Sequence, residues 1–134
     1  MAYQGYLIKI GNTILPHKYI KADSYSTTLI VQDLDSYRDM EGKLHRTALK
    51  HRVNKIEFST PAMMTDKQMT EFLQLISSNY TNVEERKVNA TVYVPEINDY
   101  MTQEMYFPDA TFSIYGIFRG VVRYNSVRFA LIAY

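Results

Sequence analysis

The sequence predicts a mainly β fold of the α+β class: an antiparallel β-sandwich or partly closed barrel with one amphipathic helix. Three observations support this prediction. Apolar and polar residues alternate through most of the 134-residue chain, one stretch has helical spacing, and one long segment has few apolar residues. A two-residue period is typical of strands that bury one face, and the 3.6-residue period is typical of an amphipathic helix.

Alternation defines the predicted strands. It is clearest where Val88, Ala90, Val92 and Val94 alternate with other residues, and it recurs where Ile56 and Phe58 face the core. The predicted extended segments are residues 6–10, 18–30, 53–60, 88–94, 101–107, 110–114, 121–124 and 127–133. Gly11-Asn12, residues 95–99 and Asn125-Ser126 are the turn signals, so the last two segments are expected to form a terminal hairpin. Gly116 and Gly120 indicate a bulge or turn at the end of a strand.

One helix is predicted over about residues 65–79. Thr65 and Gln68 have the spacing of a capping box, in which each side chain bonds the other's backbone N–H. The apolar stripe that follows consists of Met69, Phe72, Leu73, Ile76 and Tyr80. Asn79 is expected to end the helix in the left-handed conformation. Since so short a helix cannot bury its stripe alone, it must lie on a sheet face or close a barrel end.

The polar segment, residues 32–55, has a split charge pattern. Asp33, Asp35, Asp39 and Glu41 precede a turn at residues 40–42, with Arg38 as the one base among them. Five bases and no acid follow, at positions 43, 46, 50, 52 and 55. We expect a long, exposed hairpin or loop with oppositely charged strands. The strands either pair with each other or contact a neighbouring subunit, and the two interpretations are compatible.

The candidate protein-interface residues all lie in this segment. They are Tyr37, Arg38, Lys43, Arg46, Lys50 and Arg52.

Composition limits the function classes. The length favours a single domain, residues 1–134. A net charge of +1 gives no general attraction to nucleic acid or to a membrane. No cysteine is present, which excludes disulfides and thiolate chemistry and fits a reducing compartment. No segment has the pattern of a signal peptide, and the apolar run 129–134 is too short to span a bilayer.

No motif for catalysis, a metal or a cofactor is found, so we expect no enzyme. His45 and His51 are six residues apart, about 20 Å along an extended strand, too far to share one metal ion. The acids from Asp33 onward miss the EF-hand calcium pattern, because Tyr37 and Arg38 occupy the fifth and sixth positions of that loop. A hydrolase site assembled from scattered acids is the remaining catalytic alternative.

Two binding alternatives remain open. Twelve tyrosines and no tryptophan suit sheet packing, protein interfaces, or carbohydrate recognition by exposed rings. Arg119, Arg123 and Arg128, with nearby aromatic residues, are the candidates for contact with nucleic acid. A solvated strand face explains these arginines better.

Several segments resemble a known family. They are residues 32–46, residues 55–61, Asn79-Tyr-Thr-Asn82, Glu85-Arg-Lys87 and Tyr124-Asn-Ser-Val-Arg128. The chain is similar over most of its length to small uncharacterised proteins from the tail gene region of tailed bacteriophages and prophages of Gram-positive bacteria. The resemblance implies a tail or baseplate structural protein, or a tail-assembly protein, that acts by contact with other phage tail proteins. It further implies a homo-oligomeric ring, synthesis in the bacterial cytoplasm and a place in the virion tail. It leaves the position open among tube, baseplate and joint, and assigns no catalytic residue.

Overall fold

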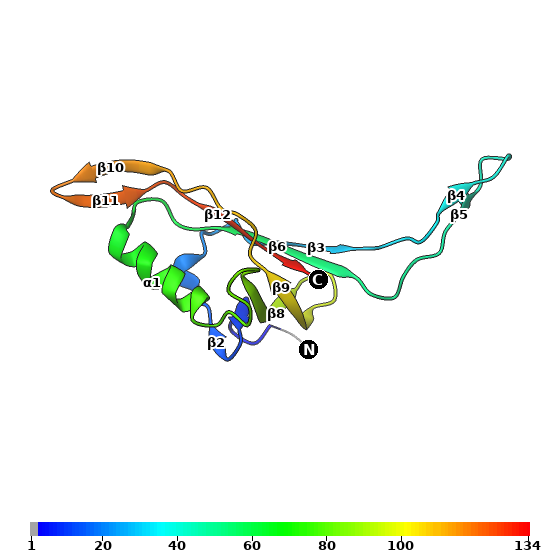
Figure 1. Cartoon of the computed structure of the whole chain (residues 1–134), viewed down its shortest axis with the longest axis horizontal. Helices are drawn as coiled ribbons and strands as arrows, with labels where there is room; N and C mark the ends of the chain where they lie inside the picture. Colours follow the sequence, from blue (N-terminus) through cyan, green and yellow to red (C-terminus); the bar gives the residue numbers. More distant parts are fainter. Residues whose placement is uncertain (1–2) are drawn as a thin grey trace.

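The computed structural model describes residues 3–134, which form three antiparallel sheets, one α-helix and one short 3-10 helix (Figure 1). The seven-stranded sheet has the order β2 (Thr13–Ile14), β1 (Ile8–Ile10), β8 (Lys87–Val94), β9 (Asp99–Tyr106), β12 (Arg128–Ala133), β6 (Val53–Ser59), β3 (Ser26–Ile30). The three-stranded sheet has the order β10 (Ile114–Phe118), β11 (Val121–Tyr124), β7 (Met64–Thr65). A two-stranded sheet pairs β4 (Tyr37–Arg38) with β5 (Leu44–His45). The mainly β, α+β prediction is confirmed.

The seven-stranded sheet is open but strongly curved. The Tyr25 hydroxyl, just before β3, donates a 2.6 Å hydrogen bond to the backbone oxygen of Tyr93 on β8. These two strands stand four positions apart in the sheet order, which in a flat sheet would separate them by about 19 Å. The sheet therefore curls until its two parts face each other, as in a sandwich, and burial raises the pKa of Tyr25.

The buried face of the sheet follows the alternation of the sequence. Ile56 and Phe58 on β6 are buried, whereas Lys55 and Glu57 are half-buried and form an ion pair at 3.0 Å. On β8 the four alternating apolar residues, Val88, Ala90, Val92 and Val94, are fully buried. A two-residue period thus places every second side chain in one common core.

Helix α1 (Asp66–Ser77) packs its apolar stripe onto this core. The capping box is present: Gln68 N–H donates to the Thr65 hydroxyl (3.2 Å), and Thr65 N–H donates to the Gln68 side chain (3.0 Å). Phe72 is fully buried, edge-on to both Phe58 and Phe129, with ring centroids 6.4 and 5.0 Å away. No described helix is long and apolar enough to cross a membrane.

The predicted C-terminal cap of the helix is wrong. Asn79 does not have a positive φ; instead its side-chain amide donates to the Leu75 carbonyl at 2.8 Å. The asparagine therefore satisfies a free carbonyl of the last turn with its side chain, which makes a left-handed backbone unnecessary.

Two predicted strands are wrong in extent. In the predicted strand 18–30, the first two residues belong to η1 (His17–Tyr19) and Asp23 has a positive φ of 66°, so the strand β3 begins only at Ser26. Residues 110–113 are irregular in spite of their alternation, and β10 begins at Ile114. In both places local pattern favours a strand, but no neighbouring strand supplies a ladder of hydrogen bonds.

The predicted terminal hairpin is also wrong. β11 pairs with β10 and β7, whereas β12 pairs with β6 and β9. Asn125 and Ser126 therefore lie where the chain passes from one sheet to the other. Buried Thr60 at the end of β6 holds this crossing, because its backbone N–H and hydroxyl bond Val127 at 2.9 and 3.0 Å.

Two long hairpins leave the core in opposite directions (Figure 1). We call residues 31–52, which connect β3 to β6 and contain β4 and β5, the arm. We call residues 114–124, formed by β10, β11 and the turn between them, the apolar hairpin. The predicted polar segment thus projects as expected, although residues 53–55 belong to β6.

The aromatic cluster gives a test of the core. We expect Phe72→Ala to lower the free energy of unfolding by about 3–5 kcal/mol, since it opens a cavity among well-packed rings. Leu73→Ala is the matched control on the same helix, because Leu73 is 37% exposed, and should cost about 1 kcal/mol. Urea unfolding followed by circular dichroism measures both. Equal losses for the two variants would contradict this packing.

Candidate functional site

The arm is a two-stranded ribbon held by its own backbone. Leu34 N–H donates to Thr47 at 2.8 Å, and Leu49 N–H donates to Gln32 at 2.7 Å. Beyond them Tyr37 lies opposite His45, and their rings stack with centroids 4.9 Å apart. All arm residues are exposed except Gln32 and Asp39, which are half-buried. The arm thus keeps its form with little packing against the core.

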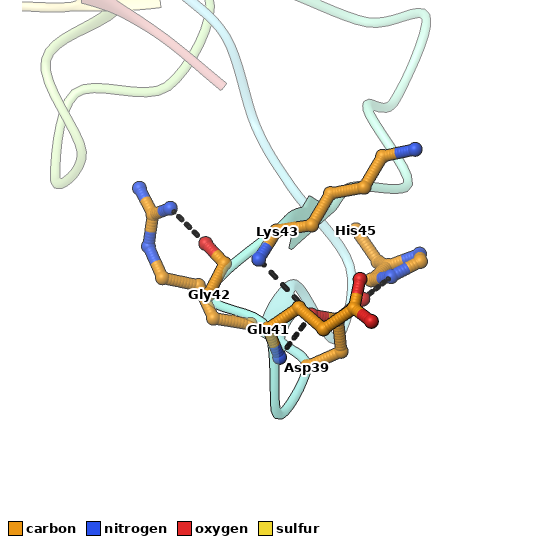
Figure 2. A network of polar contacts seen from close by, with 6 residues as sticks. Asp39, Glu41, Gly42, Lys43 and His45 are labelled. Atoms are coloured by element: carbon orange, nitrogen blue, oxygen red, sulfur yellow. Dashed lines mark hydrogen bonds and ion pairs between the residues drawn. The ribbon is translucent and has the colours of Figure 1, made fainter.

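A carboxylate organises the tip of the arm. Figure 2 shows Asp39 accepting hydrogen bonds from the backbone N–H groups of Glu41 and Lys43, both at 3.0 Å. Its second oxygen lies 2.8 Å from His45 Nε2. The His45 hydrogen bond, together with the Lys43 amide, lowers the pKa of Asp39 below its ordinary value of 3.8. The turn that the sequence predicts at residues 40–42 is confirmed, with Gly42 at a φ of 84°.

The six predicted interface residues divide into two groups. Tyr37, Arg38 and Arg46 contact the arm itself: Tyr37 stacks on His45, Arg38 donates to the Gly42 carbonyl at 2.9 Å, and Arg46 pairs with Asp33 at 2.9 Å. The side chains of Lys43, Lys50 and Arg52 are exposed and make no ion pair within residues 3–134. Pairing between the strands therefore occurs at Asp33 and Arg46, while three cations face outward.

Apolar side chains are also exposed along the arm. Tyr37 is 59% exposed and Met40 at the tip is fully exposed, with Leu34, Leu44 and Leu49 at least two-fifths exposed. Several exposed apolar residues between charges on one projecting element are typical of a contact surface.

The base of the arm is tied to the sheet by contacts that the sequence did not reveal. His51 Nε2 lies 2.7 Å from the backbone oxygen of Tyr134, and Gln103 donates to the Arg52 carbonyl at 3.2 Å. Tyr134 in turn donates its hydroxyl to Glu85 at 2.7 Å, which raises the pKa of Tyr134 to about 12. Residues 83 positions apart meet here, so spacing along the chain carries no signal of the contact.

The apolar hairpin is a second exposed surface that sequence reasoning missed. Ile114, Tyr115, Ile117 and Phe118 are each about half exposed or more, and Ile117 reaches 65%. A two-residue turn at Arg119 and Gly120, both with positive φ, joins the strands. This Arg-Gly pair between apolar runs was the available sequence signal. The bulge or turn expected between Gly116 and Gly120 is present as this turn, and a register shift lies between Ile114 and Gly116 within β10.

The tyrosines act mainly within the fold. Tyr93 donates to Asn98 at 2.6 Å and Tyr100 donates to the Tyr6 carbonyl at 2.8 Å. The Tyr93 and Tyr100 rings meet edge-on with centroids 5.4 Å apart, and Tyr3 packs edge-on against Tyr93. These hydroxyls are directed into the chain's own hydrogen bonds, which supports the sheet-packing interpretation.

The ionisable groups form no recognisable catalytic set. Among residues 3–134 no three His, Asp or Glu side chains are grouped to hold a metal ion. A cavity of about 370 Å³ near the start of α1 contains one carboxylate, Glu71, with Lys18 and Arg123. Two of the arginines considered for contact with nucleic acid have partners within the chain. Arg123 donates to the Met63 carbonyl, and Arg128 forms an ion pair with Glu57. The Arg128 hydrogen bond lowers the pKa of the Glu57 carboxyl.

These features define a class: an open, curved antiparallel β protein with one helix and two projecting hairpins, whose distinctive surfaces suit contact with other proteins. The chain belongs to DUF6711, a family of unknown function, whose model matches residues 1–134. A search of the curated proteins finds no significant match.

Chains in three solved structures are similar to this one, two of them with a TM-score above 0.5. A chain in the tail of an empty gene transfer agent particle, determined with helical refinement and C6 symmetry, is 16% identical with a TM-score of 0.52, covering 99% of this chain and 95% of that one. A chain in the native gene transfer agent virion is 17% identical with a TM-score of 0.51 and the same coverage. A chain in the cap that terminates the anti-feeding prophage tube is 15% identical with a TM-score of 0.45, covering 99% of this chain and 90% of that one.

The Asp39 network predicts a pH dependence at the tip. A lowered pKa in the folded arm means that the charged carboxylate stabilises the turn above the ordinary Asp pKa, and that this support is lost as pH falls through the Asp39 pKa. We expect the backbone amide signals of Glu41 and Lys43 in NMR spectra to titrate together with a midpoint below 3.8.

Asp39→Asn is the control for this titration, since the amide oxygen can still accept both hydrogen bonds but has no charge to lose. Its two amide signals should not titrate in this range. A midpoint above 3.8 in the unmodified protein would show that Asp39 does not hold the turn.

Proposed function

We propose that this protein is a structural subunit of a phage-like tail and that it acts by protein–protein contact, without catalysis. The observation that carries the proposal is the fold shared with a gene transfer agent tail chain over 99% of this chain and 95% of that one. Fold alone does not define function, but here two exposed hairpins provide the surfaces that a subunit needs.

The arm is the proposed contact with a neighbouring subunit. It projects from the core and retains its form through Asp39 and the Asp33–Arg46 pair. It leaves Lys43, Lys50 and Arg52 exposed and without an ion pair within residues 3–134. A preorganised element loses little conformational entropy on binding, which favours affinity. Tyr37, Arg38 and Arg46 then contribute ring and guanidinium surface on the same ribbon.

The tail of the empty gene transfer agent particle, which contains the similar chain, was determined with helical refinement and C6 symmetry. This symmetry supports a ring of identical subunits for the present protein as well. The expected partners are other copies of this chain and other tail proteins of the particle. The protein would be made in the cytoplasm of a bacterial host, a Gram-positive one by the resemblance described above, and would then reside in the virion tail.

Location in a particle tests the proposal directly. Particles purified from a bacterium that carries this gene should contain the protein in multiple copies by quantitative mass spectrometry. Antibodies to it should label the tail in electron micrographs. Particles that contain the other tail proteins but lack this one would contradict the structural role and favour an assembly factor.

Neutralising the free cations tests the arm. We expect Lys43→Gln, Lys50→Gln and Arg52→Gln together to weaken self-association at least tenfold, because they remove charge from the proposed contact without breaking an ion pair within the chain. Light scattering at concentrations where the unmodified protein assembles measures this effect. The free energy of unfolding should stay within about 0.5 kcal/mol.

The matched control removes the same charge from the body at three exposed positions, as Lys18→Gln, Lys21→Gln and Lys67→Gln. These changes should affect assembly less than the arm variant does. Equal oligomer size for the arm variant and the unmodified protein would count against the arm.

A further inference from the structure

The outer edge of β10 is an unprotected strand edge. β10 lies at the end of the three-stranded sheet and bonds only β11 among the described strands. Its residues include no charge and no proline, the usual protection of an exposed edge. Ile117 and Phe118, on opposite faces of the strand, are 65% and 49% exposed. Such an edge needs a partner that covers apolar side chains and supplies backbone hydrogen bonds.

The segment that contains β10 and the residues after it carries only positive charge. Residues 110–134 contain three arginines and no acid. Arg123 and Arg128 are bound within the chain, to the Met63 carbonyl and to Glu57. The Arg119 side chain at the turn makes no hydrogen bond or ion pair within residues 3–134, and it is exposed. The surface therefore fits a strand that has both apolar and acidic residues.

The outgoing half of the arm, residues 33–41, which contains the strand β4, has this composition. Between residues 33 and 41 it carries four acids and one base, with Leu34, Tyr37 and Met40 exposed among them. Asp35 and Glu41 make no ion pair within the described chain. Among the described strands β4 bonds only β5, so its outer edge is open as well. The returning half of the arm presents Lys43 and Lys50, which would repel Arg119. These cations are left for another surface of a neighbouring subunit, in the contact proposed above.

The two surfaces cannot meet within one molecule, because they lie at opposite ends of its longest axis (Figure 1). We propose that the apolar hairpin of one copy binds the outgoing half of the arm, residues 33–41 with the strand β4, of a second copy. The contact joins two different surfaces, so its repetition builds a ring or a helical array rather than a closed pair. The inference rests on the proposed function in taking the partner to be another copy of this chain.

Cysteine cross-linking tests the contact, and the absence of native cysteine makes each introduced thiol unique. Leu34→Cys protein is mixed with Ile117→Cys protein under mild oxidation, and the mixed dimer is quantified by mass spectrometry. We expect the mixed dimer to exceed, at least tenfold, that formed when Val83→Cys replaces Ile117→Cys. Val83 is the matched control, since it is a comparably exposed apolar residue, at 73%, outside both hairpins. Equal yields from the two mixtures would overturn the proposal.

A charge exchange tests the register. Adding Arg119→Asp to the Ile117→Cys protein should lower the yield of mixed dimer at least fivefold, because the new carboxylate is repelled by the acids of residues 33–41. Aspartate is chosen because it tolerates the positive φ of this turn. Adding Asp35→Arg to the Leu34→Cys protein should restore the yield. A yield that Arg119→Asp leaves unchanged would overturn the assignment of the acidic edge.

The cross-linking result does not depend on where the protein lies in a particle. Absence from the tail with efficient cross-linking would refute the proposed function alone, and presence in the tail without cross-linking would refute this contact alone.

Discussion

Burial of one face of β6 and of its neighbour β12 against α1 is the constraint on which the rest of the structure depends. Phe58 on this strand contacts Phe72 of the helix and Phe129 of β12, which themselves meet edge-on 5.0 Å apart. β6 also bonds both β3 and β12 over five registered positions each. Because a slip of one residue would turn Ile56 and Phe58 outward, the register of this pairing is strongly specified.

The positions of both projecting hairpins depend on the placement of β6. The β3–β6 pair continues outward as the arm once the apolar alternation ends at Val53. At the other end Thr60 binds Val127, so the segment between β9 and β12 must leave the core and return, and it does so as the apolar hairpin. A single well-packed strand thereby directs two surfaces of different chemistry to opposite ends of the molecule. This geometry suits a subunit that contacts more than one neighbour.

The two hairpins keep their form by different means. The arm has short-range hydrogen bonds from Asp39 and an ion pair between Asp33 and Arg46, with little apolar packing. The apolar hairpin has a tight turn at Arg119 and Gly120 and is joined to β7 through backbone pairing at Arg123 and Tyr124. We therefore expect the arm to be sensitive to charge and pH, and the form of the apolar hairpin to depend on its turn geometry and on its pairing with β7.

The sequence by itself determined whatever depends on neighbours along the chain. The period of two indicated β6 and β8, and the Thr65–Gln68 spacing indicated the start of α1. The split charge pattern of residues 32–55, with few apolar residues, indicated the exposed arm. The proposed interface residues were selected on the same local pattern, which correctly indicated that they are exposed. Tertiary structure alone decided which strands pair. The expected hairpin across Asn125 and Ser126 does not form, because Val127 forms hydrogen bonds with Thr60, which is more than sixty residues away in the sequence. Likewise, the partners of His51 and the free edge of β10 follow from contacts between distant segments, and such contacts leave no periodicity in the sequence.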